Sequence, residues 1–187
     1  MNGPGLLRGD DSVLLLIDLQ TRLAASMPAE TYARTRAAAI ALARAAGELG
    51  VPVLATRQYP KGLGPIDGDL ESALPDAAMT IDKTCFAASD SEPLTEALRA
   101  TGRRQVVIGG METHVCVLQT AAGLAASGHV PSVVADAACA RDPAHHENAL
   151  ARLRAAGIAV TNHESVLFEW LRDARHDRFK AVSALLR

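Results

Sequence analysis

Cys116 is the side chain in this sequence best placed to act as a nucleophile. It follows an apolar run, residues 106–108, which predicts a buried strand; two glycines end the run, and an alanine-rich helix begins almost at once. A thiol in the first turn of a helix lies near unpaired N–H groups and the positive end of the helix dipole. That environment favours the thiolate, which attacks carbonyl carbon. Because free cysteines are commonly buried packing residues, a structural role is the alternative.

Two further reactive side chains follow apolar runs. Asp18 comes directly after residues 12–17, and Lys83 comes shortly after residues 77–81. A buried carboxylate needs polar partners, so Asp18 either caps a loop or accepts the thiol proton and returns it to a leaving amine. Lys83 is either an ordinary exposed loop residue or a charge that keeps Cys116 and Asp18 ionised. If all three runs are parallel strands, these side chains meet at the sheet edge where such folds bind ligands.

The elements that must position these residues alternate along the chain. Strands are predicted at residues 12–17, 51–56, 77–81, 104–108, 130–135 and 158–161, helices at 31–49, 91–100, 113–127, 143–156, 165–171 and 176–186, and a long glycine- and proline-rich loop at 57–69. Ser91 is expected to cap its helix, and Asp136 to end the fifth strand. Alternation predicts parallel βαβ units. We therefore expect a single domain, residues 1–187, with an α/β fold: a Rossmann-like three-layer α/β/α sandwich around a mostly parallel six-stranded sheet.

Composition narrows the class of protein. The chain has 187 residues, is 49% hydrophobic and carries a formal net charge of −2, which gives no reason to expect nucleic acid or an anionic membrane as partner. Its apolar runs are too short to span a bilayer. Residues 1–10 lack the basic start and long apolar middle of a signal peptide. Three cysteines without framework spacing favour a reducing, cytoplasmic location, with Cys85 and Cys139 interpreted as packing residues.

Four segments together resemble one family. They are residues 16–20 (Leu-Ile-Asp-Leu-Gln), Lys83, residues 108–117 (Ile-Gly-Gly-Met-Glu-Thr-His-Val-Cys-Val) and residues 134–137 (Val-Ala-Asp-Ala). The chain is similar to the isochorismatase-like hydrolases, the cysteine-hydrolase superfamily that includes nicotinamidases and N-carbamoylsarcosine amidases. Residues 58–64 and 164–169 look like the branch of isochorismatase domain-containing proteins, whose substrates are largely undefined.

This resemblance implies a site and a reaction. It implies a triad of Cys116, Asp18 and Lys83, and a non-proline cis peptide bond between Met111 and Glu112. The Glu112 and Cys116 N–H groups would then form an oxyanion hole. Asp18 would deprotonate the thiol, the thiolate would attack an amide-like carbonyl, and water would hydrolyse the thioester. The expected activity is hydrolysis of a small amide, ureido or related C–N bond.

The same resemblance bears on metals. Nicotinamidases of this superfamily carry an aspartate and two histidines around a metal after the second strand, where this chain reads Arg57-Gln-Tyr-Pro without a histidine. His145 and His146 are adjacent and cannot face one ligand together from a helix. We therefore expect no metal and no cofactor, and nicotinamidase activity is disfavoured.

Residues that flank the triad in sequence are candidates to contact the substrate. They are Gln20, Gln58, Tyr59, Phe86, Thr113 and His114, with Glu112 as a further neighbour whose side chain could instead stabilise the helix start.

Other functions remain open at this stage. An activated thiolate could serve a redox sensor or peroxide-reactive protein, although neither other cysteine has the C-x-x-C spacing of a resolving partner. A vinyl ether hydrolase of the isochorismatase type would not need Cys116. A dinucleotide-binding module would need a G-x-G-x-x-G after the first strand, where Asp18-Leu-Gln-Thr-Arg-Leu stands. We also expect a homo-oligomer, a dimer or larger, because apolar residues of the closing helices (Val166, Leu167, Phe168, Trp170 and Leu171) could pack on the body or on another subunit.

Overall fold

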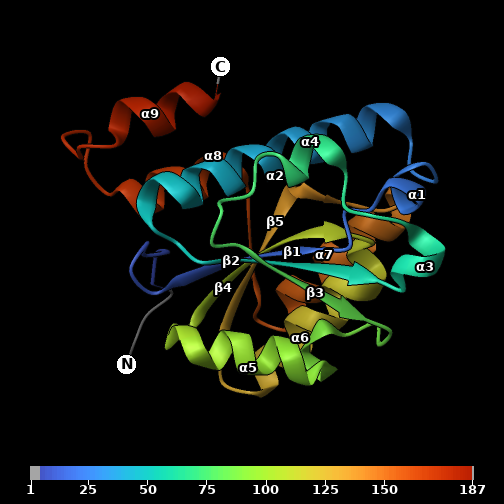
Figure 1. Ribbon diagram of the computed structural model, residues 1–187. Helices are drawn as coiled ribbons and strands as arrows, with labels where there is room; N and C mark the ends of the chain where they lie inside the picture. Colours follow the sequence, from blue (N-terminus) through green and yellow to red (C-terminus); the bar gives the residue numbers. More distant parts are fainter. Residues whose placement is uncertain (1–4, 187) are drawn as a thin grey trace.

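The computed structural model describes residues 5–186 and shows one parallel sheet between two layers of helices (Figure 1). The strands are β1 (Ser12–Ile17), β2 (Val53–Gln58), β3 (Met79–Lys83), β4 (Gln105–Met111), β5 (Val130–Cys139) and β6 (Ala159–Thr161). Their order is β3-β2-β1-β4-β5-β6, and every pair is parallel. The predicted α/β class and six-stranded three-layer sandwich are confirmed. The first four residues, on which part of the signal-peptide expectation depends, lie outside the described residues.

Alternation along β1 builds a core on each face of the sheet. Leu14 and Leu16 pack with α2 (Ala29–Leu49) and α8 (His163–Leu171). Val13, Leu15 and Ile17 pack on the other face with α5 (Glu92–Thr101), α6 (Leu118–Ala126) and α7 (Pro143–Ala155). Strands buried on both faces are typical of parallel sheets. The remaining helical segments are α1 (Thr21–Ala24), α3 (Pro60–Leu63), α4 (Gly68–Glu71), α9 (Phe179–Ser183), the 3₁₀ turns Ala88–Asp90 and Ala184–Leu186, and the π-helical turn Thr113–Val117.

β4 was expected to end at the two glycines. It instead runs through both of them to Met111. Gly110 has a φ of 132°, and a Cβ there would collide with the carbonyl oxygen of Ile17 in β1. A Cβ on Gly109 would lie 2.9 Å from the carbonyl oxygen of Ala137 in β5. The glycines therefore allow β4 to lie close to its two neighbours, which is a tertiary requirement and not a turn signal.

β5 is also longer than predicted. It continues to Cys139, so Asp136 lies inside the strand and not at its end, and Cys139 is the last residue of the strand. The pairing with β4 shifts between Ile108 and Gly110, an irregularity that lets β5 use more residues than β4 over the same length. Asp136 accepts hydrogen bonds from the backbone and ring nitrogens of His163, which holds the start of α8.

The segment between β1 and α5 differs from its prediction in several places. β2 and β3 both lie two residues later than expected, so Lys83 is the last residue of β3 and not part of the following loop. The predicted loop 57–69 contains the end of β2, the one-turn helix α3 and the first two residues of α4. Ser91 occupies the N-cap of α5 without a side-chain capping bond.

The closing helices pack onto the body of the same chain. Four of the five apolar residues named for α8 are buried against α2 and the sheet, whereas Phe168 is 41% exposed and lies with its ring centroid 6.4 Å from that of Phe179. The helix expected at 176–186 is the shorter α9 followed by a 3₁₀ turn. Within residues 5–186, none of the helices is both long and apolar enough to cross a bilayer.

Candidate active site

The three reactive side chains come together at the point where strand order reverses. β1 lies between β2 and β4 in the sheet. The chain builds the sheet from β1 through β2 to β3 on one side, and then through β4 and β5 to β6 on the other side. Asp18 directly follows β1, Cys116 lies in the π-helical turn after β4, and Lys83 ends β3. Open parallel sheets bind ligands at the carboxyl ends of strands at this switch point.

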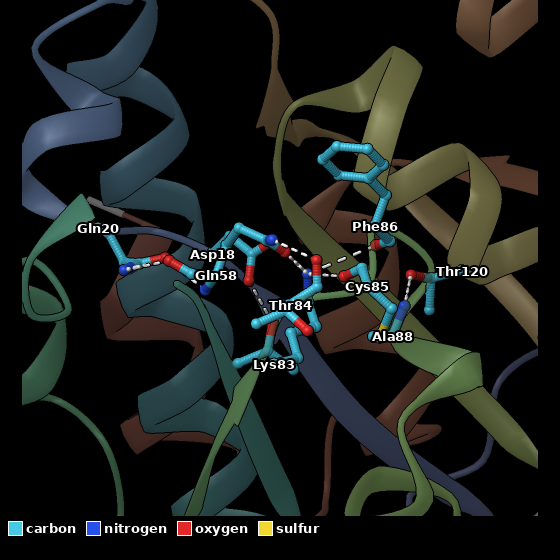
Figure 2. Close-up of polar contacts among 10 residues, drawn as sticks. Asp18, Gln20, Gln58, Lys83, Thr84, Cys85, Phe86, Ala88 and Thr120 are labelled. Carbon is cyan, nitrogen blue, oxygen red and sulfur yellow. Dashed lines mark hydrogen bonds and ion pairs between the residues drawn. The ribbon is translucent and has the colours of Figure 1, made fainter. Parts of the chain in front are cut away.

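Asp18 and Lys83 form a buried ion pair (Figure 2). The Lys83 Nζ lies 2.7 Å from the Asp18 Oδ2, and neither side chain is exposed. The Asp18 Oδ1 accepts a second hydrogen bond from the Thr56 hydroxyl at 2.7 Å. Asp18 has a φ of 53°, a left-handed conformation uncommon outside glycine but tolerated by aspartate. This strain lies where the chain leaves β1, the kind of position at which unusual backbone often accompanies function.

Lys83 is held by a ring of acceptors. Its Nζ also donates to the Gln58 Oε1 at 2.6 Å and to the carbonyl oxygens of Cys85 and Phe86 at 3.2 and 3.4 Å. Alternation in β3 buries Ile81 and Lys83 on the same face of the strand. The position of Lys83 in β3 therefore places its side chain on the buried face of the strand, where it meets Asp18.

The two glutamines lie beside the ion pair as supports (Figure 2). The Gln58 Nε2 donates to the Thr84 carbonyl oxygen at 2.7 Å, so both ends of its amide contact the Lys83 segment. The Gln20 Nε2 donates to the carbonyl oxygens of Gln58 and Gly64, and its Oε1 accepts from the Gln58 N–H. Both glutamines, predicted as substrate contacts, thus make hydrogen bonds within the chain.

Cys116 is nearly buried, at 6% exposure. Burial raises the pKa of its thiol to about 12, the negative charge of Asp18 acts in the same direction, and Lys83 opposes it. These causes act against the expectation that the helix start favours the thiolate, because burial and the adjacent carboxylate both disfavour the charged form of the thiol.

The segment that follows Lys83 and the helix that follows the Cys116 turn are joined by a hydrogen bond. The Thr120 hydroxyl of α6 accepts from the Ala88 N–H at 2.8 Å, in the segment that follows Lys83 (Figure 2). Gly123 of α6 lies so close to Ser89 that a Cβ there would meet its hydroxyl. The helix that begins at the Cys116 turn and the segment behind Lys83 thus pack as one unit.

Glu112 precedes the Cys116 turn. The Met111–Glu112 peptide bond is cis. The Glu112 carbonyl oxygen accepts from the Val115 and Val117 N–H groups at 3.0 and 3.3 Å, which anchors the turn. Its side chain is 5% exposed. Burial acts to raise the pKa of Glu112, but the hydrogen bonds and charge of Arg141 lower it overall.

Thr113 and His114, also named as candidate contacts, face histidines of α7. The Thr113 hydroxyl lies 2.9 Å from the His146 Nδ1, and burial lowers the pKa of that ring. His114 lies with its ring centroid 4.8 Å from that of His145. Both residues therefore join the Cys116 turn to α7.

Tyr59 and Phe86 are the exposed members of the candidate set, at 55% and 57% exposure. Tyr59 lines a hollow of about 610 Å³ beside the edge strand β3, together with Lys83 and Cys85. Thus the structure leaves these two side chains open to solvent, whereas Gln20, Gln58 and Thr113 make hydrogen bonds within the chain and the buried His114 Nδ1 has no hydrogen-bond partner among the described residues.

Sequence reasoning missed two residues of this site, Thr56 and Arg141. Thr56 pairs with Ile17 in the strand register, one residue before Asp18, so a hydroxyl near the end of a neighbouring strand was an available signal. Arg141 had no such signal, because its approach to Glu112 depends on the irregular pairing of β4 and β5. Across residues 5–186, histidine, cysteine and acidic side chains form no group of three that could hold a metal ion.

This fold and site define a doubly wound α/β protein with a cysteine beside a buried acid–lysine pair. Residues 12–165 match the isochorismatase domain family, and the chain belongs to that family. Isochorismatase domain-containing protein 2 of Xenopus laevis is 34% identical over 182 residues, covering 97% of this chain and 86% of the relative.

Solved structures agree with this assignment. YcaC from Pseudomonas aeruginosa, solved with hexane-2,5-diol and covalent acrylamide, has a TM-score of 0.91 at 29% identity. The alignment covers 100% of this chain and 92% of the YcaC chain. The MAR1 ribonuclease from Caenorhabditis elegans has a TM-score of 0.91 at 30% identity, with coverage of 97% and 92%. The Escherichia coli ycaC gene product, described as an octameric hydrolase of unknown specificity, has a TM-score of 0.89 at 26% identity, with coverage of 100% and 91%.

Proposed function

We propose that this protein is a metal-independent cysteine hydrolase that cleaves the C–N bond of a small amide, ureido or related compound through a thioester on Cys116. The observation that carries the proposal is the buried Asp18–Lys83 pair, whose charges act on the Cys116 thiol at the switch point. A protonated thiol beside a fixed carboxylate is suited to proton transfer at the moment of attack.

The first half-reaction forms the acyl-enzyme. Asp18 accepts the thiol proton while the Cys116 sulfur bonds to the carbonyl carbon, and the carbonyl electron pair moves to oxygen. Lys83 compensates the charge of Asp18 until the proton arrives. The N–H groups of Glu112 and Cys116 donate to the oxyanion. When the carbonyl re-forms, the C–N bond breaks and the amine takes its proton from Asp18.

The second half-reaction releases the acid. Asp18, again a carboxylate, accepts a proton from water as the water oxygen attacks the thioester carbon. The sulfur leaves as thiolate and takes the proton back from Asp18, so the thiol and the Asp18–Lys83 pair are restored. The net reaction adds one water across the C–N bond.

The comparisons support the proposal at a coarser level. Family membership and a neighbour titled as a hydrolase support the hydrolase class. A neighbour carrying covalent acrylamide supports a reactive nucleophile in this fold. The octamer of another neighbour supports a homo-oligomer. Three cysteines without framework spacing favour a reducing compartment such as the cytoplasm.

The test is acylation followed by turnover. Purified protein is mixed with p-nitrophenyl acetate, and intact mass spectrometry looks for an acetyl group on Cys116. The same protein is then screened against small amides and ureides, with and without a chelator. We expect acylation and turnover in the natural protein, unchanged by the chelator, and neither in a Cys116→Ala variant that remains folded. Turnover by Cys116→Ala would refute the thioester.

The alternatives give different results. A redox sensor would show a reversible Cys116 disulfide after peroxide; the raised pKa and 6% exposure of this thiol disfavour it, because oxidation follows thiolate character and access. A vinyl ether hydrolase of the isochorismatase type would turn over isochorismate with Cys116→Ala. RNA cleavage lost in that variant would instead agree with the neighbour titled a ribonuclease.

A further inference from the structure

Arg141 makes four hydrogen bonds to the carboxylate of Glu112, the residue that precedes the Cys116 turn. Its Nη2 lies 2.7 Å from the Glu112 Oε1, and its Nε lies 3.2 and 3.1 Å from the two carboxylate oxygens. Its backbone N–H donates to the Glu112 Oε2 at 3.0 Å. One residue thus holds both carboxylate oxygens through side chain and main chain together.

The two partners differ sharply in exposure. The Arg141 side chain is 62% exposed, whereas the Glu112 side chain is 5% exposed. Ion pairs between exposed side chains contribute little, but a buried carboxylate requires its partners. Glu112 therefore depends on Arg141 for its position far more than Arg141 depends on Glu112.

The position of Glu112 is transmitted to Cys116 through backbone. The Glu112 carbonyl oxygen accepts from Val115 and Val117, the residues on either side of Cys116. In the sheet, Met111 of β4 pairs with Cys139 of β5, two residues before Arg141. Arg141 thus cross-links the ends of β4 and β5 at the place where β4 leads into the Cys116 turn.

We propose that Arg141 is a positioning residue: by holding the Glu112 carboxylate, it sets the Glu112 and Cys116 N–H groups that stabilise the oxyanion. The inference rests on the proposed function, because it assigns a role in acyl transfer. It predicts that Arg141 matters where an oxyanion forms and not where the thiol merely displaces a leaving group at saturated carbon. Small shifts of such groups matter, since misplacement of a catalytic group by about 1 Å can lower the reaction rate by about 100-fold.

The experiment compares two reactions of Cys116 in the same protein. Acetylation by p-nitrophenyl acetate passes through a tetrahedral oxyanion, whereas alkylation by iodoacetamide does not. In the Arg141→Gln variant we expect acetylation to slow by about 10- to 100-fold and alkylation to change less than about threefold. Added ethylguanidinium should restore part of the acetylation rate. The matched control is Arg175→Ala, which removes an arginine bonded to the exposed Asp173.

Each outcome has one meaning. Equal acetylation rates for the natural protein and Arg141→Gln overturn the positioning role and leave the thioester proposal standing. Parallel slowing of both reactions, without rescue by ethylguanidinium, shows a structural role and also overturns it. If the natural protein alkylates but never acetylates, the proposed function fails, and the role of Arg141 fails with it.

Discussion

Replacing Asp18 by Asn should move two reactions of Cys116 in opposite directions. The carboxylate charge raises the pKa of the thiol, while Lys83 lowers it. The Asp18→Asn substitution removes the raising charge and leaves the lysine, so the pKa of Cys116 must fall. The same substitution removes the proposed proton acceptor, so hydrolysis must also fall. The backbone should survive, because asparagine tolerates the left-handed φ of 53° found here.

The magnitudes follow from the buried setting. Two unit charges about 4 Å apart interact by about 4 kcal/mol at an effective dielectric of about 20. We expect removal of the Asp18 charge to stabilise the Cys116 thiolate by at least about 1.4 kcal/mol, which lowers the pKa of Cys116 by at least about one unit. A tenfold gain in thiolate is partly offset by its weaker nucleophilicity, which leaves alkylation at pH 7 at least about threefold faster. Loss of general base catalysis should slow hydrolysis by about 100- to 10,000-fold.

The assay is iodoacetamide alkylation of Cys116, followed by peptide mass spectrometry across pH, beside turnover of the best amide or ester found. The control is Asp136→Asn, which removes a carboxylate that is 42% exposed and paired with His163 at 2.7 Å, and it should change neither rate. Slower alkylation in Asp18→Asn, or unchanged hydrolysis, would refute the reasoning about the carboxylate.

Three further predictions concern the titration of Cys116 and the stability of the fold. In the natural protein, thiolate should increase tenfold per pH unit while pH is below the pKa of about 12, so alkylation of Cys116 should keep rising from pH 7 to 10 without a plateau. Lys83→Met should lower the free energy of unfolding in urea by about 3–5 kcal/mol, because it leaves the unexposed Asp18 without its cation. Gly110→Ala should cost more than about 3 kcal/mol by the same measurement, because its Cβ collides with β1, whereas Gly128→Ala, which also has a positive φ but meets nothing within 4 Å, should cost about 1 kcal/mol.

The two stability predictions have control variants, and each of the three predictions has a result that would contradict it. Lys61→Met removes an exposed lysine near the same hollow and should leave stability within about 0.5 kcal/mol. Equal losses for the two lysine variants would show that the buried pair does not stabilise the fold. Equal losses for Gly110→Ala and Gly128→Ala would show that close approach between β4 and β1 is not what requires glycine. An alkylation plateau near pH 7 would show that the thiol is not shielded by burial.

The sequence alone was enough to predict the fold and to place the candidate catalytic residues at one edge of the sheet. Apolar runs of strand length alternating with amphipathic helices determine a parallel sheet, because only such a sheet buries both faces of runs such as β1. Asp18 and Cys116 stand after two of those runs, and parallel strands bring their carboxyl ends to one edge. Their shared location is therefore a consequence of local pattern and strand direction.

Only the tertiary structure decided the state of the groups at that edge. The protonation of Cys116 depends on how deeply its turn is buried and on the nearness of Asp18, two quantities that no local pattern encodes. The pairing of Arg141 with Glu112 depends on an irregular register between β4 and β5, since the two residues are 29 positions apart. Sequence periodicity specifies which face a side chain occupies, but desolvation and charge are set by neighbours that distant segments supply.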